Sequence, residues 1–139
     1  MEKTLINNLC YDKNMADITF KEIVKKTNEV IAAFQKVEPR DWGIEGNMIE
    51  LAKQAGELGK NVMMLENYYL AARQDNPNYN TASKEQIGNE LSDIFFVLVR
   101  IANHYGIDLE KAHLKELDLA LAAFEAGDKA QPPWRENNK

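Results

Sequence analysis

Two acidic residues three positions apart are the first feature of this sequence that could do chemistry. Glu90 and Asp93 lie in the stretch GNELSDIFF, and on a helix they would sit one turn apart, about 60° around the axis. The neighbouring Leu91 and Phe95 place this pair close to an apolar face. Two carboxylates near a helical interior need a counter-charge, and a hard cation such as Mg²⁺ can supply it. The alternative is that both line a solvated edge of an amphipathic helix.

A second polar stripe precedes this pair in the stretch ELAKQAGELGK. Glu50, Gln54 and Glu57 recur at helical spacing and would share one side of their helix. Oxygen ligands from two facing helices could hold Mg²⁺, which commonly completes its coordination with water and phosphate. Gly56 and Gly59 would let a facing helix or a substrate approach the backbone, although ordinary packing explains them equally well.

The elements that must position these residues are four amphipathic segments with helical periodicity. They span residues 19–37, 44–71, 83–105 and 109–127, and strand signals are almost absent. Thr19 with Glu22, Ser83 with Gln86, and Asp108 are expected to cap three of the helix starts. The apolar face of the second segment is expected to consist of Met48, Leu51, Ala55, Leu58, Val62 and Leu65. This pattern predicts an all-α fold, an antiparallel four-helix bundle.

Length and composition indicate one domain, residues 1–139, with a core over about 19–127 and extensions at 1–18 and 128–139. A formal charge of −5 argues against binding a nucleic-acid polymer or an anionic membrane. Cys10 is the only cysteine, which excludes an intrachain disulfide and a Cys-rich zinc site. Without a signal-peptide pattern or an apolar run long enough to span a membrane, a cytoplasmic protein is expected.

At this point the two motifs together are recognisable. LAKQAGELGK, followed by NELSDIFFVLVRIANHYGIDLEKA, resembles the MazG-like group of all-α nucleoside triphosphate pyrophosphohydrolases, a superfamily that includes the dimeric dUTPases and the phosphoribosyl-ATP pyrophosphohydrolases. The resemblance covers roughly residues 42–112. It implies Mg²⁺-dependent cleavage of a nucleoside or deoxynucleoside triphosphate to monophosphate and pyrophosphate, with Mn²⁺ as an alternative ion. It also implies a homodimer or homotetramer, which long helices with wide apolar faces favour independently.

The family pattern, Glu-x-x-Glu on one helix and Glu-x-x-Asp on the next, can be carried over residue by residue. The resemblance makes Glu57, Glu90 and Asp93 the catalytic metal ligands, with Gln54 as a fourth ligand where the family usually has glutamate. The first motif is therefore degenerate, and Lys53 stands where a further acidic residue is frequent.

A lysine of the last helix in the family is matched by Lys115, while Asp118 takes the place of an expected asparagine. Lys115 is therefore a predicted substrate-binding residue. Two further substrate contacts are predicted from residue type. Trp42 could stack on a base or close the end of the bundle, and Arg100 could reach a phosphate or pair with a neighbouring acid.

A second hypothesis belongs to another class of protein. The departures at Lys53, Gln54 and Asp118 suit a helical module that kept the fold but weakened or lost the metal site. Such a module would bind a nucleotide or a protein partner without cleaving it. Glu50, one turn before Gln54, could restore the missing carboxylate or could be an ordinary solvated residue.

Overall fold

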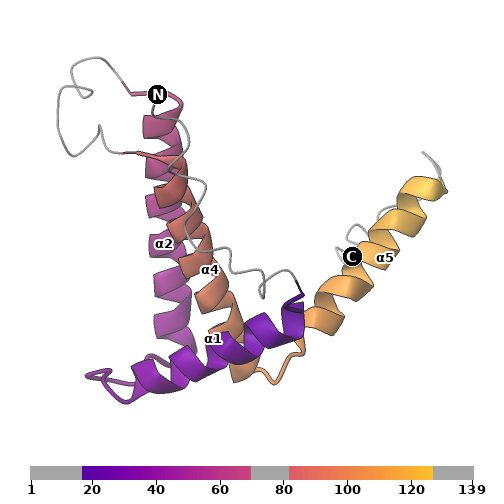
Figure 1. The fold of residues 1–139 in the computed structure, drawn as a ribbon, viewed down its shortest axis with the longest axis horizontal. Coiled ribbons are helices and arrows are strands. Elements are labelled where there is room, and N and C mark those ends of the chain that lie inside the picture. The colour runs from indigo at the N-terminus through magenta and orange to yellow at the C-terminus, as the bar shows by residue number, and fades with distance from the viewer. Residues whose placement is uncertain (1–16, 70–81, 127–139) are drawn as a thin grey trace.

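The computed structural model describes residues 17–69 and 82–126, and these residues are helical, with no strand among them. In chain order the helices are α1 (Phe20–Gln35), α2 (Gly43–Leu65), α4 (Lys84–His104) and α5 (Leu109–Glu125) (Figure 1). The predicted all-α class is thus confirmed. The predicted loop between the second and third segments, and both terminal extensions, fall wholly or mostly outside the described residues.

The start of α1 forms the predicted capping box. The Thr19 hydroxyl accepts a hydrogen bond from the Glu22 backbone N–H, and the Glu22 carboxylate accepts one from the Thr19 backbone N–H at 2.7 Å. The hydroxyl of Thr19 also donates to that carboxylate at 2.8 Å. The backbone hydrogen bond is the larger cause, and the hydroxyl hydrogen bond the next, of a Glu22 carboxyl pKa below its ordinary value.

The second helix is shorter than its periodicity predicts, ending at Leu65 rather than Ala71. The reason is local: Asn67 adopts a left-handed backbone conformation with φ 57°, which an α-helix cannot continue through. Its predicted apolar face was also wrong in detail. Met48 is 50% exposed and Val62 36% exposed, whereas the buried residues of α2 are Asn47, Gln54 and Asn61.

The junction between α4 and α5 follows the predicted capping residues. Gly106 has φ 63°, and Ile107 donates to the carbonyl of Ala102 at 2.8 Å, the closing bond of a Schellman motif. Asp108 then caps α5 by accepting from the Lys111 backbone N–H at 3.0 Å. That hydrogen bond is the main reason why the pKa of the Asp108 carboxyl lies below its ordinary value.

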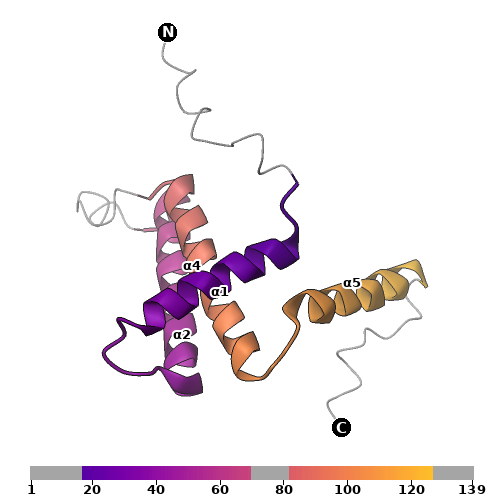
Figure 2. The same ribbon diagram turned by 60° about the horizontal axis from the view of Figure 1, so that its bottom comes forward.

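The helices pack unevenly. The views show α2 and α4 side by side, α1 crossing them near one end, and α5 extending away from all three (Figure 2). Ring pairs join α1 to α4: Phe20 lies 5.8 Å from Phe95, and Phe34 lies 6.3 Å from Phe96. The hydrophobic residues that are buried within the described part of the chain are Ile31, Val97, Val99 and Ala102. The core is therefore small and sits where α1 crosses α4.

Among the described helices, none is both long enough and apolar enough to cross a membrane.

Candidate functional site

The fully buried residues of α2 are amides, while Leu51, Leu58 and Leu65 on the same helix are half-buried. Asn47, Gln54 and Asn61 are spaced seven residues apart, close to two helical turns, so they form a single stripe along α2. They are 5%, 9% and 7% exposed. Burying an amide costs free energy unless it is hydrogen-bonded, so a stripe of three is not what packing alone would select. We refer to Asn47, Gln54 and Asn61 as the amide stripe.

Each amide of the stripe donates to a different acceptor. Asn47 Nδ2 donates to the Gly43 carbonyl at 2.7 Å within the same helix. Gln54 Nε2 donates to Glu50 Oε1 at 2.7 Å, and Asn61 Nδ2 donates to Glu90 Oε1 at 3.2 Å. The last bond crosses from α2 to α4. It fixes one carboxylate oxygen of Glu90 against the amide stripe.

The other predicted acidic ligands lie one turn from this contact. Glu57 is four residues before Asn61 on α2; its side chain is 46% exposed, and its carboxylate lies 3.8 Å from Lys60 Nζ. Asp93 is exposed and follows Glu90 by one turn on α4. Glu57, Glu90 and Asp93 therefore lie on one pair of packed helices, within about one helical turn of the contact between Asn61 and Glu90.

The donor chemistry of this helix pair suits a hard cation. Carboxylates and amide carbonyls are the oxygen ligands that Mg²⁺ takes from proteins, and the amino group of Gln54 is engaged by Glu50, which leaves its Oε1 as the ligating atom. Within residues 17–69 and 82–126, no three His, Cys, Asp or Glu side chains gather as a metal-binding group. The three predicted acidic ligands Glu57, Glu90 and Asp93 are therefore not gathered as such a group in this chain.

Glu50 occupies the position beside the degenerate motif. Its side chain is 21% exposed and accepts from both Lys53 Nζ, at 3.2 Å, and Gln54 Nε2. It thus places a carboxylate next to Gln54 and at the same time balances the positive charge of Lys53. This position agrees with both interpretations of Glu50, as a replacement for the missing carboxylate and as an ordinary helix residue.

Gly56 and Gly59 of α2 do not mediate a close helix contact within the described residues. A Cβ added at Gly56 or Gly59 would meet nothing within 4 Å. The expectation that α4 approaches the backbone there is therefore wrong for the single chain. The two glycines instead leave the surface beside Glu57 open.

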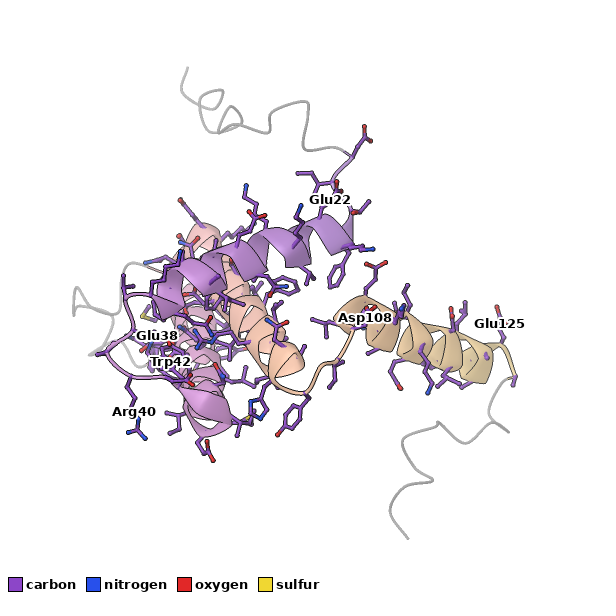
Figure 3. The ribbon with its side chains drawn as sticks, turned by 90° about the horizontal axis from the view of Figure 1, so that it is seen from below. Glu22, Glu38, Arg40, Trp42, Asp108 and Glu125 are labelled. Carbon is purple, nitrogen blue, oxygen red and sulfur yellow. The ribbon has the colours of Figure 1, made fainter. Side chains whose placement is uncertain are left out.

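Two of the predicted substrate contacts are engaged with one another in the interior. Arg100 pairs with Glu38 at 2.5 Å, and the two side chains are 4% and 3% exposed. The guanidinium also stacks over the ring of Trp42, 4.6 Å from its centroid. Glu38 and Trp42 lie together between the end of α1 and the start of α2 (Figure 3). For Arg100 this is the second of the two predicted roles, an ion pair with an acid. For Trp42 it is likewise the second role, closing the end of the bundle.

Lys115, the third predicted substrate contact, lies on α5. Because α5 extends away from α2, the chain does not bring Lys115 to the predicted metal ligands. Its substrate-binding role stays a prediction.

Glu38 and Asn61 are the residues that sequence reasoning missed. Asn61 carried a usable signal, since it is seven residues after Gln54 and four after Glu57 on the same stripe. Glu38 carried none, because its partner Arg100 is 62 residues away along the chain.

Comparison with known proteins gives one relative. The chain is 27% identical over 125 residues to the uncharacterized protein YpjD of Bacillus subtilis strain 168, covering 90% of this chain and 100% of that protein. No protein-family model matches the chain. No solved structure matches it either.

Proposed function

We propose that the chain is a Mg²⁺-dependent nucleotide pyrophosphohydrolase of the MazG-like type, acting in the cytoplasm as an antiparallel helical bundle in a homodimer or homotetramer. The substrate would be a nucleoside or deoxynucleoside triphosphate. The observation that carries this proposal is the buried amide stripe, which holds Glu90 against α2 where a purely structural helix pair would be apolar. The resemblance of the surrounding motifs supplies the reaction class.

The metal would be held by Gln54, Glu57, Glu90 and Asp93, with Mn²⁺ as an alternative ion. When bound, it would supply positive charge against the phosphates of the substrate. Asn61 keeps Glu90 oriented by its hydrogen bond, so little reorganisation is needed during the reaction. Glu57 and Asp93 are the more exposed acids, and in this proposal they would orient water or accept its proton.

In this reaction water attacks the α-phosphorus, and the bond from that phosphorus to the oxygen bridging to the β-phosphorus breaks. The products are nucleoside monophosphate and pyrophosphate. Phosphoryl transfer of this kind depends mainly on positioning and electrostatics, which an acidic helix pair can provide without a covalent nucleophile.

The test is pyrophosphate release from a panel of canonical and modified triphosphates with Mg²⁺ or Mn²⁺. Glu90→Gln should lower the rate by about 100-fold or more, because it removes a charge that the site needs. Glu85→Gln is the matched control, since it makes the same change at an exposed acid in the first turn of α4. Gln54→Glu should raise the rate by restoring a carboxylate.

A second function is favoured by the contacts around Glu50. Lys53 and Gln54 both bind that carboxylate, which lowers the negative charge available to a cation. In this alternative the chain is a weakened or inactive module that binds a nucleotide or a protein partner. Absence of pyrophosphate release from wild type, Gln54→Glu and Glu85→Gln alike would contradict the enzyme and leave this alternative.

A further inference from the structure

A polar cavity of about 340 Å³ lies where three helix ends meet. Its lining comes from the ends of α1 and α4, from the start of α2 and from the segment that leads into α2. Asn47 of this lining precedes Gln54, the nearest predicted metal ligand on α2, by seven residues, which is about 10 Å along the helix. The cavity is therefore two helical turns away from the proposed metal site. We refer to it as the helix-end cavity.

The inner part of this lining carries an acceptor that has no partner. Asn47 is 5% exposed, its Nδ2 donates to the Gly43 carbonyl, and its Oδ1 has no hydrogen-bond partner among the described residues. A buried amide oxygen that stays unpaired costs free energy. Because the amide nitrogen is already engaged, only a hydrogen-bond donor can satisfy this side chain.

Two exposed residues of the lining add acceptors at the rim. Asp41 Oδ1 accepts from the Gly43 backbone N–H at 3.3 Å, so Oδ2 is the oxygen that remains for a ligand. Asn103 Nδ2 donates to Asn28 Oδ1 at 2.7 Å, so its own Oδ1 remains. With Asn47 Oδ1, the cavity is lined by three such oxygens. A primary ammonium group carries the same number of N–H donors.

The charged side chains of the cavity leave a net negative charge. Arg100 also lines it, but its guanidinium is paired with the buried carboxylate of Glu38. Asp41 has no ion-pair partner among the described residues, and its neighbour Arg40 is exposed and points outward (Figure 3). The remaining titratable side chain of the lining is the imidazole of His104. A cation is therefore better suited to this cavity than an anion.

The helix ends add partial charges of the same kind. The C-terminal end of a helix carries a partial negative charge, and both α1 and α4 end at the cavity, at Gln35 and His104. Helix α2 begins there and contributes a partial positive charge, which two acids oppose. Asp41 accepts the Gly43 N–H, and a Cβ at Gly43 would lie 3.3 Å from the Glu45 carboxylate. The three helix ends together favour a cation.

We propose that the helix-end cavity binds a small primary amine in its ammonium form. The ammonium group donates to Asn47 Oδ1 and to the rim oxygens of Asp41 and Asn103. An anionic ligand would meet three acceptors and the Asp41 charge, so phosphate and carboxylate groups are excluded from this position. The site uses none of the predicted metal ligands, so it does not depend on the proposed reaction.

The test compares three probes of the same length: n-butylamine, 1-butanol and butyrate. In NMR titrations n-butylamine should shift the side-chain amide resonances of Asn47 and Asn103, whereas the other two should not. Asn47→Leu, which removes the unpaired oxygen, and Asp41→Asn, which removes the charge, should each weaken amine binding by about 10-fold or more. Met48→Leu and Asp17→Asn, at exposed positions outside the lining, are the matched controls and should bind as wild type does.

The probes and variants also define the results that overturn the proposal. Equal shifts from 1-butanol would mean that the site needs a donor but no charge, and shifts from butyrate would mean an anion site. The same shifts from K⁺ or Mg²⁺ alone would assign the oxygens to an inorganic ion. Unchanged amine affinity in Asp41→Asn would remove the charge argument, and this exposed position keeps the test valid if urea denaturation shows that Asn47→Leu does not fold. No shift from any probe would mean that the cavity holds water only.

Discussion

The buried residues of α4, which are Val97, Val99, Arg100 and Ala102, all lie in its C-terminal half, whereas the N-terminal half carries the acids Glu90 and Asp93. The first half contacts Asn61 of the amide stripe, whereas the second half packs under α1 and shares a pocket with Asn47. The N-terminal half of α4 therefore lowers the stability of the fold through its buried polar contact, and the C-terminal half raises it through packing. The buried polar contact between Asn61 and Glu90 can persist because the ring pairs between α1 and α4 and the buried aliphatic residues of α4 stabilise the rest of the packing.

The largest effect should come from the packed half. Arg100→Ala leaves the Glu38 carboxylate buried without its counter-charge, so the free energy of unfolding should fall by about 3–5 kcal/mol. Urea denaturation followed by circular dichroism measures this. Lys53→Ala breaks an exposed ion pair to Glu50 and should cost under about 1 kcal/mol. Equal losses in the two variants would contradict the expected difference between a buried and an exposed ion pair.

The polar half should respond less strongly. Asn61→Leu leaves the half-buried Glu90 carboxylate without its amide donor, so the free energy of unfolding should fall by about 1–3 kcal/mol. Mn²⁺ binding should weaken by about 10-fold because Glu90 loses the hydrogen bond that orients it. Isothermal titration with Mn²⁺ alone and urea denaturation give the two readouts. Met64→Leu, a volume-conserving change at a half-buried position on α2, is the control. Unchanged Mn²⁺ affinity in Asn61→Leu would remove the positioning role.

A smaller effect is expected where the packed half of α4 ends. Gly106 has φ 63°, so Gly106→Ala strains the backbone by about 1–2 kcal/mol, although a Cβ there would meet nothing within 4 Å. Thermal unfolding should show the loss. Gly88→Ala, in the polar half of the same helix and with open space around it, should instead stabilise the chain slightly. A loss at Gly88 as large as at Gly106 would show that the difference is not conformational.

The smallest effect concerns pH. The carboxyls of Glu22 and Asp108 have pKa values below their ordinary ones because each accepts backbone hydrogen bonds at a helix start. A lowered pKa means that the stabilisation is complete above the ordinary value and is lost as pH falls through the lowered one. The starts of α1 and α5 should therefore fray in acid, whereas the start of α4, capped by the hydroxyl of Ser83, should not. Carbon chemical shifts across an acid titration would show this, and equal fraying of all three would contradict it.

Local features of this protein could be predicted from its sequence with good detail. Thr19, Ser83 and Asp108 each accept the hydrogen bond expected of a capping residue, and Gly106 takes the left-handed conformation expected after α4. These interactions involve groups within four residues, so neighbouring residue types are enough to determine them.

The candidate site could be predicted only in part. The sequence pointed to Gln54 and to Glu90, and the structure shows that Gln54 is buried on the side of α2 whose Asn61 contacts Glu90. Asn61 was missed because hydrophobic periodicity draws attention to Met48 and Val62, which the structure leaves exposed. Nothing local marked Glu38 either, since its burial depends on Arg100 from a distant helix.

The sequence by itself determined where the helices begin and what chemistry their acidic residues offer, because helix propensity and capping act over a few neighbouring residues. Only the tertiary structure decided which side of α2 faces α4 and which acid pairs with Arg100, namely Glu38. It also decided that the leucines of α5 are left uncovered within the described residues. Those outcomes depend on contacts between residues far apart in the chain. A helix can satisfy its own backbone alone, but which of its faces is buried depends on its partner.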